Sequence, residues 1–480
     1  MESQAYGQFI FRDRYRYVVL VVSTLCISSI FSNVVTMNFT VNCMDPSEYK
    51  NNTEVNFPLH AYDAREKSVI QWTISLTSML ATFPFSYLCT RFGAKYLFLA
   101  SGILSAVATG FIPPAASWGF GWLVLTRVFQ GISYACDFAV IGVISTRWAA
   151  LSDISIFLSV LTLFPAFSNI FTNPLAGFVC SSSLGWPWVH YLHGAVGLFL
   201  FTLWFIFYTD LPENNKFVSS KELKVIQEQK SEAHKAEKRK IPYVKVVKNP
   251  IVWTVWLNAF VDLFAAFFFI LYGPTYNAKV LNYDPKNNGL LGALEYAGII
   301  PLKILAGYAS DKYNCLPERQ KMWVYNTLCT VVPGLIFIVV CYLPTSIPLL
   351  TIILFAVSNA FVGFNGGGYY RCAVLVTRQY AEFVLAFTQF IKSACFFIAP
   401  LLVELFVKDE RNAKQWHIIF WIMAVFLILA NVVFCYFATD KPASFVIESE
   451  NNEETDEKRR KSSSKFADID LSSPTFSSKL

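Results

Sequence analysis

The sequence predicts an all-α membrane protein with twelve transmembrane helices arranged as two six-helix bundles. Three observations predict this fold class. The chain of 480 residues is 55% hydrophobic and only 15% charged, whereas soluble domains carry about 25% charged residues. Its apolar residues recur in about a dozen runs of roughly twenty residues, which is the length that crosses a bilayer core. A polar stretch at 209–250 separates the first six runs from the second six.

The apolar runs predict where each helix lies along the chain. We expect spans at 17–42, 68–90, 95–113, 119–145, 156–180 and 190–208, and then at 251–273, 287–308, 323–343, 348–374, 383–405 and 416–438. The chain then divides into a cytosolic N-terminus (1–16), an N-terminal bundle (17–208), a cytosolic central loop (209–250), a C-terminal bundle (251–438) and a cytosolic tail (439–480). Ser219 and Glu222 form a capping-box pattern that predicts a short helix in the central loop. The tail is polar, and we expect it to be disordered from residue 445 on.

Basic residues set the orientation of the spans. The loops after even-numbered spans hold Arg91, Lys95, Arg147, Arg319, Lys321 and Arg378, and loops rich in Lys and Arg remain in the cytosol. The net charge of +6 is concentrated in such loops, so it does not indicate nucleic-acid binding. The first run lacks a small-residue cleavage site, which predicts a retained helix rather than a removable signal peptide.

The outer side of the membrane then carries two candidate modifications. Asn51-Asn52-Thr53 is an acceptor pattern for glycosylation at Asn51 in the first outer loop. Cys43, Cys180 and Cys341 fall near outer helix ends, where a disulfide can form, and the sequence leaves the pairing open.

Two segments at equivalent places in the two halves resemble one signature. Residues 87–95 read Tyr-Leu-Cys-Thr-Arg-Phe-Gly-Ala-Lys, and residues 307–313 read Gly-Tyr-Ala-Ser-Asp-Lys-Tyr. Both resemble the gating signature of the major facilitator superfamily, here carried by Arg91, Gly93, Asp311 and Lys312. Thr90 stands where that family has Asp. A signature repeated in both halves indicates internal duplication.

A longer series of motifs resembles one branch of that superfamily, the anion–cation symporters, which include sodium/phosphate, sialic acid and vesicular glutamate transporters. The motifs are Arg-Val-Phe-Gln-Gly at 127–131, Arg-Trp-Ala at 147–149, Asn-Pro-Leu-Ala-Gly at 173–177, Gly-Trp-Pro-Trp-Val-His-Tyr at 185–191, Gly-Phe-Asn at 363–365, Arg-Gln-Tyr-Ala at 378–381 and the segment 415–420. The resemblance implies two bundles that rock about a central site. It also implies transport of a small organic anion or phosphate, driven by a proton, sodium or voltage gradient.

The sequence departs from this family at its charged positions. Thr36, Gln71, Tyr134 and Val261 stand where the family has Arg, His, Glu and Arg, and Arg127 keeps its charge. These departures weaken the prediction that the solute is glutamate, and they weaken the prediction of proton coupling further.

Charged residues inside the spans are candidates for the transport site, because a charge at mid-membrane costs about 2.5 to 3.5 kcal/mol. We expect Arg127 to hold the acidic group of the solute, since its planar donors suit a carboxylate or phosphate; the alternatives are a structural ion pair or a side chain that reaches the helix end. Asp262 is either the acidic partner of Arg127 or a carboxylate that takes a proton or sodium ion. Glu295 and Asp137 complete the expected coupling set.

Two lysines in the spans have weaker claims on the site. Lys303 is expected to reach the helix end rather than a partner. Lys392 needs an internal partner that the sequence does not identify.

Neutral polar residues complete the expected solute-binding set with Arg127. They are Asn33, Thr36, Gln71, Tyr134 and Asn365. Asn365 opens a glycine-rich segment at 365–370, and spans interrupted by glycine often open near a solute site. Close helix packing through small residues explains the same glycines equally well.

The sequence therefore predicts a secondary transporter of a small organic anion or phosphate. The alternatives are a transporter of a neutral or zwitterionic solute and a receptor or scaffold that binds without translocating. We expect no enzyme activity, cofactor, metal or nucleic-acid partner; the partners are the solute and the lipid bilayer. The tail lacks an acidic-dileucine pattern, which favours the plasma membrane over an internal one.

Overall fold

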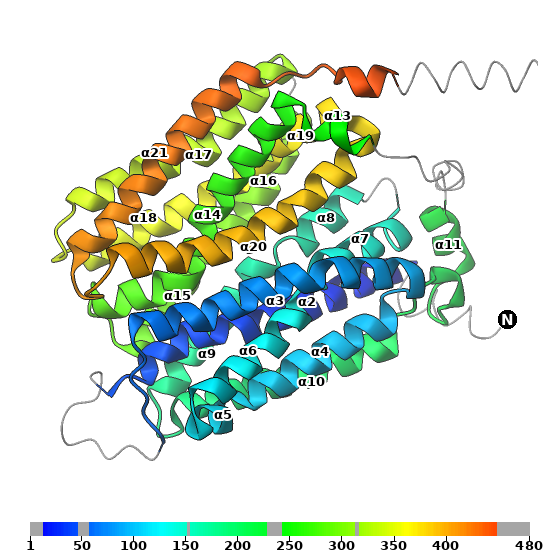
Figure 1. Ribbon diagram of the computed structural model, residues 1–480. Helices are drawn as coiled ribbons and strands as arrows, with labels where there is room; N and C mark the ends of the chain where they lie inside the picture. Colours follow the sequence, from blue (N-terminus) through cyan, green and yellow to red (C-terminus); the bar gives the residue numbers. More distant parts are fainter. Residues whose placement is uncertain (1–12, 47–56, 151–153, 228–241, 313–315, 449–480) are drawn as a thin grey trace, which may run out of the picture.

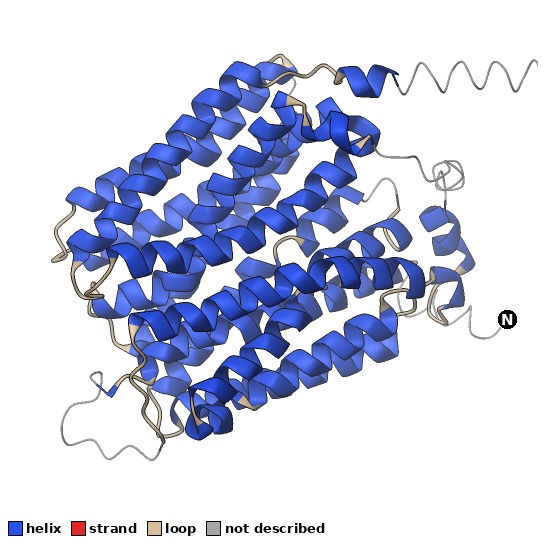
Figure 2. Ribbon diagram, in the orientation of Figure 1, coloured by secondary structure: helices blue, strands red, loops and turns tan. Residues whose placement is uncertain are grey.

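The computed structural model describes residues 13–46, 57–150, 154–227, 242–312 and 316–448. Every regular element in these residues is a helix (Figure 2). The long helices lie side by side in two groups, with the first half of the chain, from blue to green-cyan, below the second half, from green to orange (Figure 1).

The N-terminal group holds the helices of the first six expected spans. They are α2 (Tyr15–Cys43), α3 (Ala64–Phe92), α4 (Lys95–Gly110) with α5 (Ile112–Trp118), α6 (Phe120–Tyr134) with α7 (Asp137–Arg147), α8 (Ile154–Leu161) with α9 (Phe164–Cys180), and α10 (Gly185–Phe207). The central loop follows with η3 (Pro212–Asn214), α11 (Ser220–Gln227) and α13 (Tyr243–Val247).

The C-terminal group holds the helices of the second six. They are α14 (Pro250–Lys279), α15 (Pro285–Ala297) with α16 (Ile299–Lys312), α17 (Glu318–Tyr342), α18 (Pro348–Phe361) with η4 (Val362–Gly367) and α19 (Tyr369–Thr377), η5 (Arg378–Tyr380) with α20 (Ala381–Phe406), and α21 (Ala413–Phe437).

The helices have the length and composition of membrane spans. Among the described residues, nine helices are long and apolar enough to cross a bilayer, and the bent pair α4–α5 raises the number to ten. Of the remaining two expected spans, α3 is long but richer in polar residues, and α9 has only 17 residues. Large apolar side chains also face outward, such as Leu80, which is 72% exposed, and Phe83, which is 71% exposed. Such a surface is suited to lipid. The predicted all-helical membrane fold is confirmed.

Several expected spans are interrupted rather than continuous. The axes of α4 and α5 differ by 48°, at a point where prolines open α5 and cannot donate backbone hydrogen bonds to α4. The tenth span changes to the short 3-10 helix η4 within its glycine-rich segment, because glycine disfavours the α-helix. The glycines of this span therefore mark a real break in the helix.

The two bundles pack closely where α9 crosses α15. A Cβ atom on Gly177 would lie 2.5 Å from the Pro285 carbonyl oxygen, and one on Gly289 would lie 2.3 Å from the Asn173 carbonyl oxygen. Only glycine permits this approach, as at other close helix crossings in membranes. The motif at 173–177 thus contributes to the contact between the bundles.

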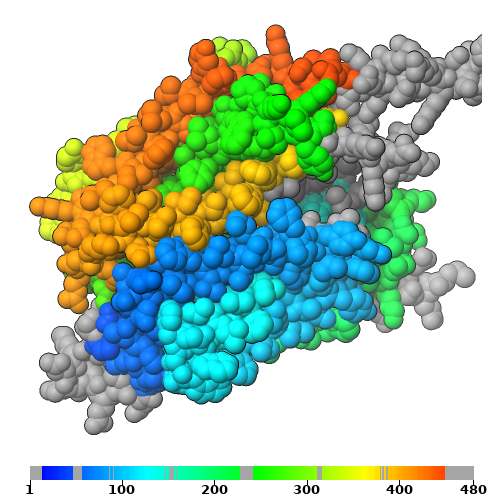
Figure 3. Space-filling view, viewed as in Figure 1, coloured from blue at the N-terminus to red at the C-terminus, as the bar shows by residue number. Residues whose placement is uncertain are grey.

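Contacts near the helix ends that the sequence predicts to face outward, here called the outer ends, extend this packing. Lys67 pairs with Glu410 at 2.7 Å, and Lys279 pairs with Asp45 at 2.7 Å. Trp72 on α3 donates a hydrogen bond to the Phe397 carbonyl on α20 at 2.9 Å. Figure 3 shows these two helices side by side, α3 in blue and α20 in orange, along the boundary between the halves. The outer ends of the bundles are therefore held together.

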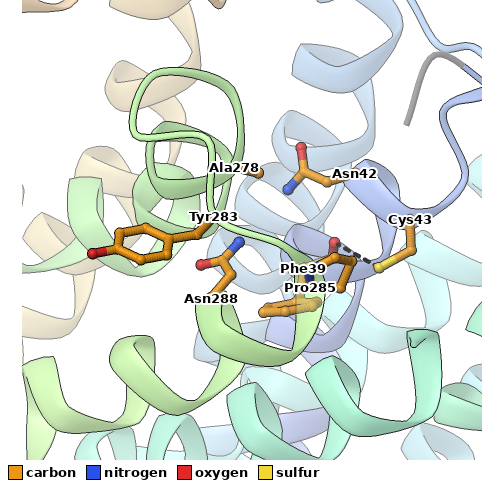
Figure 4. Close-up of a pocket in the computed structure, with 7 residues that line it drawn as sticks. All are labelled: Phe39, Asn42, Cys43, Ala278, Tyr283, Pro285 and Asn288. Carbon is orange, nitrogen blue, oxygen red and sulfur yellow. Dashed lines mark hydrogen bonds between the residues drawn. The ribbon is translucent and has the colours of Figure 1, made fainter. Parts of the chain in front are cut away.

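A small cavity lies at this outer boundary (Figure 4). Its lining comes from the ends of α2 and α14 and the start of α15, and consists of Phe39, Asn42, Cys43, Ala278, Tyr283, Pro285 and Asn288. Its volume is about 10 Å³, roughly enough for one water molecule. This cavity is too small for an organic solute.

The central loop folds back onto the start of α2. Ser219 accepts a hydrogen bond from the Glu222 amide at 3.1 Å, as the capping-box pattern predicts. The Glu222 carboxylate, however, accepts from the amides of Tyr15 and Arg16 at 3.0 and 2.9 Å. It therefore caps α2 instead of its own helix, because those first-turn amides have no partner within α2. Figure 1 shows α11 beside this end of α2.

Two features outside the spans refine the sequence expectations. Residues 444–448 are helical, and Phe445 and Val446 are buried, so the described start of the tail is ordered where disorder was expected. Its buried apolar residues pack against the C-terminal bundle, with the ring centroids of Phe445 and Tyr380 5.9 Å apart. Cys43 and Cys180 form a disulfide, whereas Cys341 is free.

Candidate functional site

Arg127 lies inside the N-terminal bundle, on α6, with no exposed surface. Its Nη1 nitrogen donates to Gln130 Oε1 at 2.6 Å and to the Val34 carbonyl at 3.2 Å, and Nε reaches the Ile70 carbonyl at 3.5 Å. All of these acceptors are neutral. Its Nη2 nitrogen is buried without a hydrogen-bond partner among the described residues. The guanidinium is therefore fixed in place but keeps an unused donor.

Gln130 connects Arg127 to two neighbouring helices. Its Nε2 nitrogen donates to Thr109 Oγ1 on α4 at 2.7 Å and to the Asn33 carbonyl on α2 at 3.0 Å. The Asn33 side chain itself donates to Ser105 at 3.0 Å, so this predicted solute contact is engaged within the bundle. We did not predict Gln130 or Thr109 as part of the site. The position of Gln130 within the 127–131 motif is the sequence feature that could have pointed to it.

Thr36 and Gln71, two further predicted contacts, are also engaged. Thr36 donates to the Ser32 carbonyl of its own helix at 2.6 Å. Gln71 donates to the Asn38 side chain, and Asn38 donates to the Ile270 carbonyl of α14 at 3.2 Å. Gln71 therefore belongs to a polar connection between the bundles, one residue beyond the Ile70 carbonyl that Arg127 contacts.

Asp262 is buried in the C-terminal bundle, on α14. Its carboxylate accepts from Tyr369 Oη at 2.7 Å, from Asn365 Nδ2 at 3.2 Å and from Cys329 Sγ at 3.4 Å. Tyr369 and Asn365 stand on the two sides of the break that ends η4. Asp262 thus fastens the interrupted tenth span to α14.

Of the two roles expected for Asp262, the ion pair with Arg127 is not formed in the described residues of this conformation. Each charge is bound by neutral groups of its own bundle. Sequence placed both residues on spans that line the centre of this fold. It did not give the rotation of each helix, which directs the two side chains into separate bundle interiors.

A different ion pair joins the bundles. Lys392 Nζ on α20 donates to Asp137 Oδ2 on α7 at 2.6 Å, and the two side chains are only 3% and 2% exposed. Gln389, one turn before Lys392, donates to Asp137 Oδ1 at 3.0 Å. The partner that Lys392 needs is therefore Asp137, which the sequence analysis had assigned to coupling.

Aromatic rings surround this ion pair. The Lys392 ammonium lies 4.4 Å from the centroid of the Tyr134 ring and 4.6 Å from that of Phe138, within the range of a cation–π interaction. Tyr134, a predicted solute contact, thus lies in this cluster, and its hydroxyl has no hydrogen-bond partner among the described residues.

Two charged residues of the eighth span have definite partners. Glu295 is buried on α15 and accepts from Asn277 Nδ2 on α14 at 2.9 Å. Lys303 Nζ on α16 donates to Thr162 Oγ1 of the N-terminal bundle at 3.4 Å. Lys303 therefore reaches across to the other bundle rather than to its helix end, contrary to expectation.

The first copy of the gating signature is completed by Asp210, from the end of the sixth span. Asp210 Oδ1 accepts from the amides of Ala94 and Lys95 at 2.6 and 3.2 Å and lies 3.5 Å from Arg147 Nη1. Gly93 adopts φ +87°, and a Cβ atom there would lie 2.5 Å from the Asp210 carboxyl carbon. Gly93 is thus required for both its backbone conformation and the close approach of Asp210. Thr90 stands where the family has Asp, and a different acid, Asp210, contacts this segment instead.

The remaining signature residues are less informative. Arg91 is exposed and donates to the Tyr87 hydroxyl at 2.8 Å. Asp311 and Lys312 end α16, and their side chains lie outside the part that the structure describes. Asn51, the expected glycosylation site, also lies outside the described residues. Within those residues, no three His, Cys, Asp or Glu side chains gather as metal ligands.

The fold and these buried charges define a class of protein: a polytopic membrane transporter with polar groups inside and between two helical bundles. The chain belongs to the Major Facilitator Superfamily, whose family description matches residues 16–400. It is a secondary transporter and not an enzyme.

Known proteins place the chain among distant relatives. It is 24% identical over 388 residues to "Sialin" of Homo sapiens, covering 79% of this chain and 76% of that protein. It is 25% identical over 445 residues to "Sodium-dependent phosphate transport protein 1" of Rattus norvegicus, covering 88% and 93%. These names agree with the resemblance to the anion–cation symporters.

A solved structure supports the fold. The inward-facing bacterial homolog of the human lysosomal transporter Spinster matches with a TM-score of 0.63 and 15% identity, covering 89% of this chain and 99% of that chain.

Proposed function

We propose that this protein moves a small organic anion or phosphate across its membrane by alternating access, driven by a proton or sodium gradient. The observation that carries the proposal is the Arg127 guanidinium, which is fully buried and has one nitrogen without an acceptor among the described residues.

The charge of Arg127 favours an anionic solute. Its hydrogen-bond acceptors are two backbone carbonyls and one amide oxygen, and such neutral acceptors do not cancel a positive charge. A buried cation is stabilised most effectively by a hydrogen-bonded anion. A carboxylate or phosphate oxygen also forms short, charge-assisted bonds to a guanidinium. The free Nη2 nitrogen is therefore the atom that we assign to the acidic group of the solute.

The arrangement of contacts suits one state of an alternating-access cycle. The outer ends are joined by the close α9–α15 crossing and by two ion pairs, and the cavity there holds only about one water molecule. In this conformation the solute has no route to the outside. We infer that the outer gate is closed, and that opening it requires the α9–α15 contact to separate.

The coupling role is proposed for two buried carboxylates, Asp262 and Glu295. Asp262 and Glu295 are each bound by neutral donors in the C-terminal bundle. A proton or sodium ion that neutralises either carboxylate would alter these hydrogen bonds, and through Asp262 it would alter the break in the tenth span. The membrane we propose is the plasma membrane, because the tail lacks an acidic-dileucine pattern.

Uptake into liposomes that contain the purified protein tests the proposal. The panel holds phosphate, sialic acid, urate, dicarboxylates, amino acids and neutral sugars, each under an imposed proton, sodium or voltage gradient. Arg127→Ala is compared with Arg411→Ala, which removes an exposed arginine of an outer loop. We expect one anion to accumulate, the Arg127 variant to lose that accumulation and the Arg411 variant to keep it. Accumulation of only neutral or zwitterionic solutes would contradict the anion proposal.

A further inference from the structure

We propose that Lys392 is a second binding residue for the acidic group of the solute, and that Asp137 occupies this cation when no solute is present. The inference rests on the proposed function and deepens it. On entry, the solute carboxylate takes the place of the Asp137 carboxylate at Lys392 Nζ, and no covalent bond changes.

The position of the pair supports this role. Asp137 belongs to the N-terminal bundle and Lys392 to the C-terminal bundle, and they are joined by a 2.6 Å contact with almost no exposure. The bundles must move relative to each other in alternating access, so this contact cannot remain unchanged through the cycle. A buried cation that loses its anion needs a replacement, because an unpaired buried charge is strongly unfavourable. A solute anion is the replacement that a transporter of anions provides.

The surroundings of the pair favour an exchange of anions. Tyr134, Phe138 and Phe164 place their ring centroids 4.4, 4.6 and 5.7 Å from the Lys392 ammonium. Aromatic faces attract a cation, so they stabilise Lys392 while one carboxylate leaves and another arrives. Gln389 holds the departing Asp137 through its amide nitrogen, and its buried amide oxygen has no partner among the described residues.

The same surroundings indicate the body of the solute. Around Tyr134 the rings of Phe31 and Phe396 lie at centroid distances of 5.4 and 6.1 Å, and Phe267 lies 4.7 Å from Phe396. These rings come from helices of both bundles. A group of aromatic side chains like this one suits a solute with an apolar or aromatic body rather than a fully hydrated ion. The proposed solute is therefore a carboxylate on an apolar body, and inorganic phosphate fits the site less well.

Benzoate is a suitable probe, with benzamide as its uncharged counterpart of similar shape. The variants in the full-length protein are Lys392→Met, Asp137→Asn and the double variant, with Lys245→Met and Glu448→Gln as controls. The controls remove an exposed ion pair between the central loop and the tail, outside the contacts assigned to binding or to the outer gate. Uptake kinetics and protection by benzoate against thermal unfolding are measured for each variant.

We expect the double variant to remain folded, because it leaves no unpaired charge, and to lose at least about tenfold in kcat/KM for benzoate. We expect Asp137→Asn to lower the KM for benzoate, because the internal competitor for Lys392 has lost its charge. The Lys245 and Glu448 variants should keep the wild-type KM, and benzamide should not be accumulated by any variant.

Two results would overturn the inference. A folded double variant with wild-type KM for benzoate would make the pair purely structural. An unchanged or raised KM in Asp137→Asn would do the same, even where the Lys392 variants fail to fold. If those results appear while Arg127→Ala still abolishes anion uptake, the proposed function stands and only the role of Lys392 fails. If the wild-type protein accumulates no anion, the proposed function itself fails.

Discussion

Arg127 and Asp262 are both fully buried charges, one in each bundle, yet their surroundings differ. Arg127 has neutral acceptors for part of its guanidinium and keeps Nη2 free. Asp262 receives three donors, from Tyr369, Asn365 and Cys329. The positive charge therefore has unused binding capacity, whereas the negative charge already holds together two parts of its own bundle. From this difference we assign solute binding to Arg127. Asp262 instead holds the tenth span to α14, and neutralising its carboxylate would weaken that connection.

The largest expected effect comes from removing the free donor of Arg127. Arg127→Met should lower kcat/KM for the transported anion by roughly 10- to 100-fold, because hydrogen bonds to charged groups contribute about 1.5 to 3 kcal/mol. Initial uptake rates into proteoliposomes over a range of solute concentrations measure the change. Arg127→Lys keeps the charge but not the planar donors, so its kcat/KM should lie between those of Arg127→Met and the wild-type protein. Wild-type kinetics in Arg127→Met would show that Arg127 does not bind the solute, and would contradict the different roles assigned to Arg127 and Asp262.

A smaller effect is expected when Asp262 is neutralised. Asp262→Asn should reduce gradient-driven accumulation by about tenfold and leave gradient-free exchange of the solute within about twofold of wild type. The reason is that coupling needs a carboxylate that can be neutralised, whereas solute binding is assigned to other residues, Arg127 and Lys392. Parallel accumulation and counterflow assays measure the two processes. An equal loss in both assays would mean that Asp262 contacts the solute.

The double variant Arg127→Met with Asp262→Asn tests whether the charges are independent. Their effects on kcat/KM should combine within about 0.5 kcal/mol, as for residues that share no partner. A double-mutant cycle on uptake kinetics measures this interaction energy. Recovery of transport in the double variant would instead indicate that the two charges pair in another state of the cycle.

The smallest effect concerns the donors that surround Asp262. Tyr369→Phe removes its shortest hydrogen bond, at 2.7 Å, and should lower the free energy of unfolding by about 1.5 to 3 kcal/mol without changing the KM for the anion. Thermal unfolding in detergent measures the stability. Tyr342→Phe, at a side chain that is 77% exposed, is the control and should have no effect. A raised KM in Tyr369→Phe would place the break in the tenth span at the solute site.

Local patterns in the sequence were sufficient for the helices and for two of their details. Apolar length predicts a span because the bilayer core excludes unpaired backbone groups. For the glycine-rich segment that begins at Asn365, an interruption was one of two equal expectations, beside close helix packing, and Cys43 and Cys180 were two of the three candidates for a disulfide. These features depend on residues close together in the chain or on helix ends at the same side of the membrane.

Side-chain partners across helices were not predictable in the same way. A pair between Arg127 and Asp262 was one of two roles considered for Asp262, and Lys392 had no identified partner. Glu222 was expected to cap its own helix, but it caps α2. Asp210 was not singled out, although it supports the first gating segment. Each of these contacts joins segments far apart in the sequence, and each depends on the rotation of a helix about its axis.

The sequence by itself therefore determined the membrane environment, the helical class, the family resemblance and the identity of the few charges that can act inside the bundles. Only the tertiary structure decided which of these charges are paired, with Asp137 bound to Lys392 and Arg127 left with a free donor. The physical reason is that burial energy depends on composition along a run of residues. Hydrogen bonds and ion pairs instead require partners within about 3 Å, a distance set by how the helices pack.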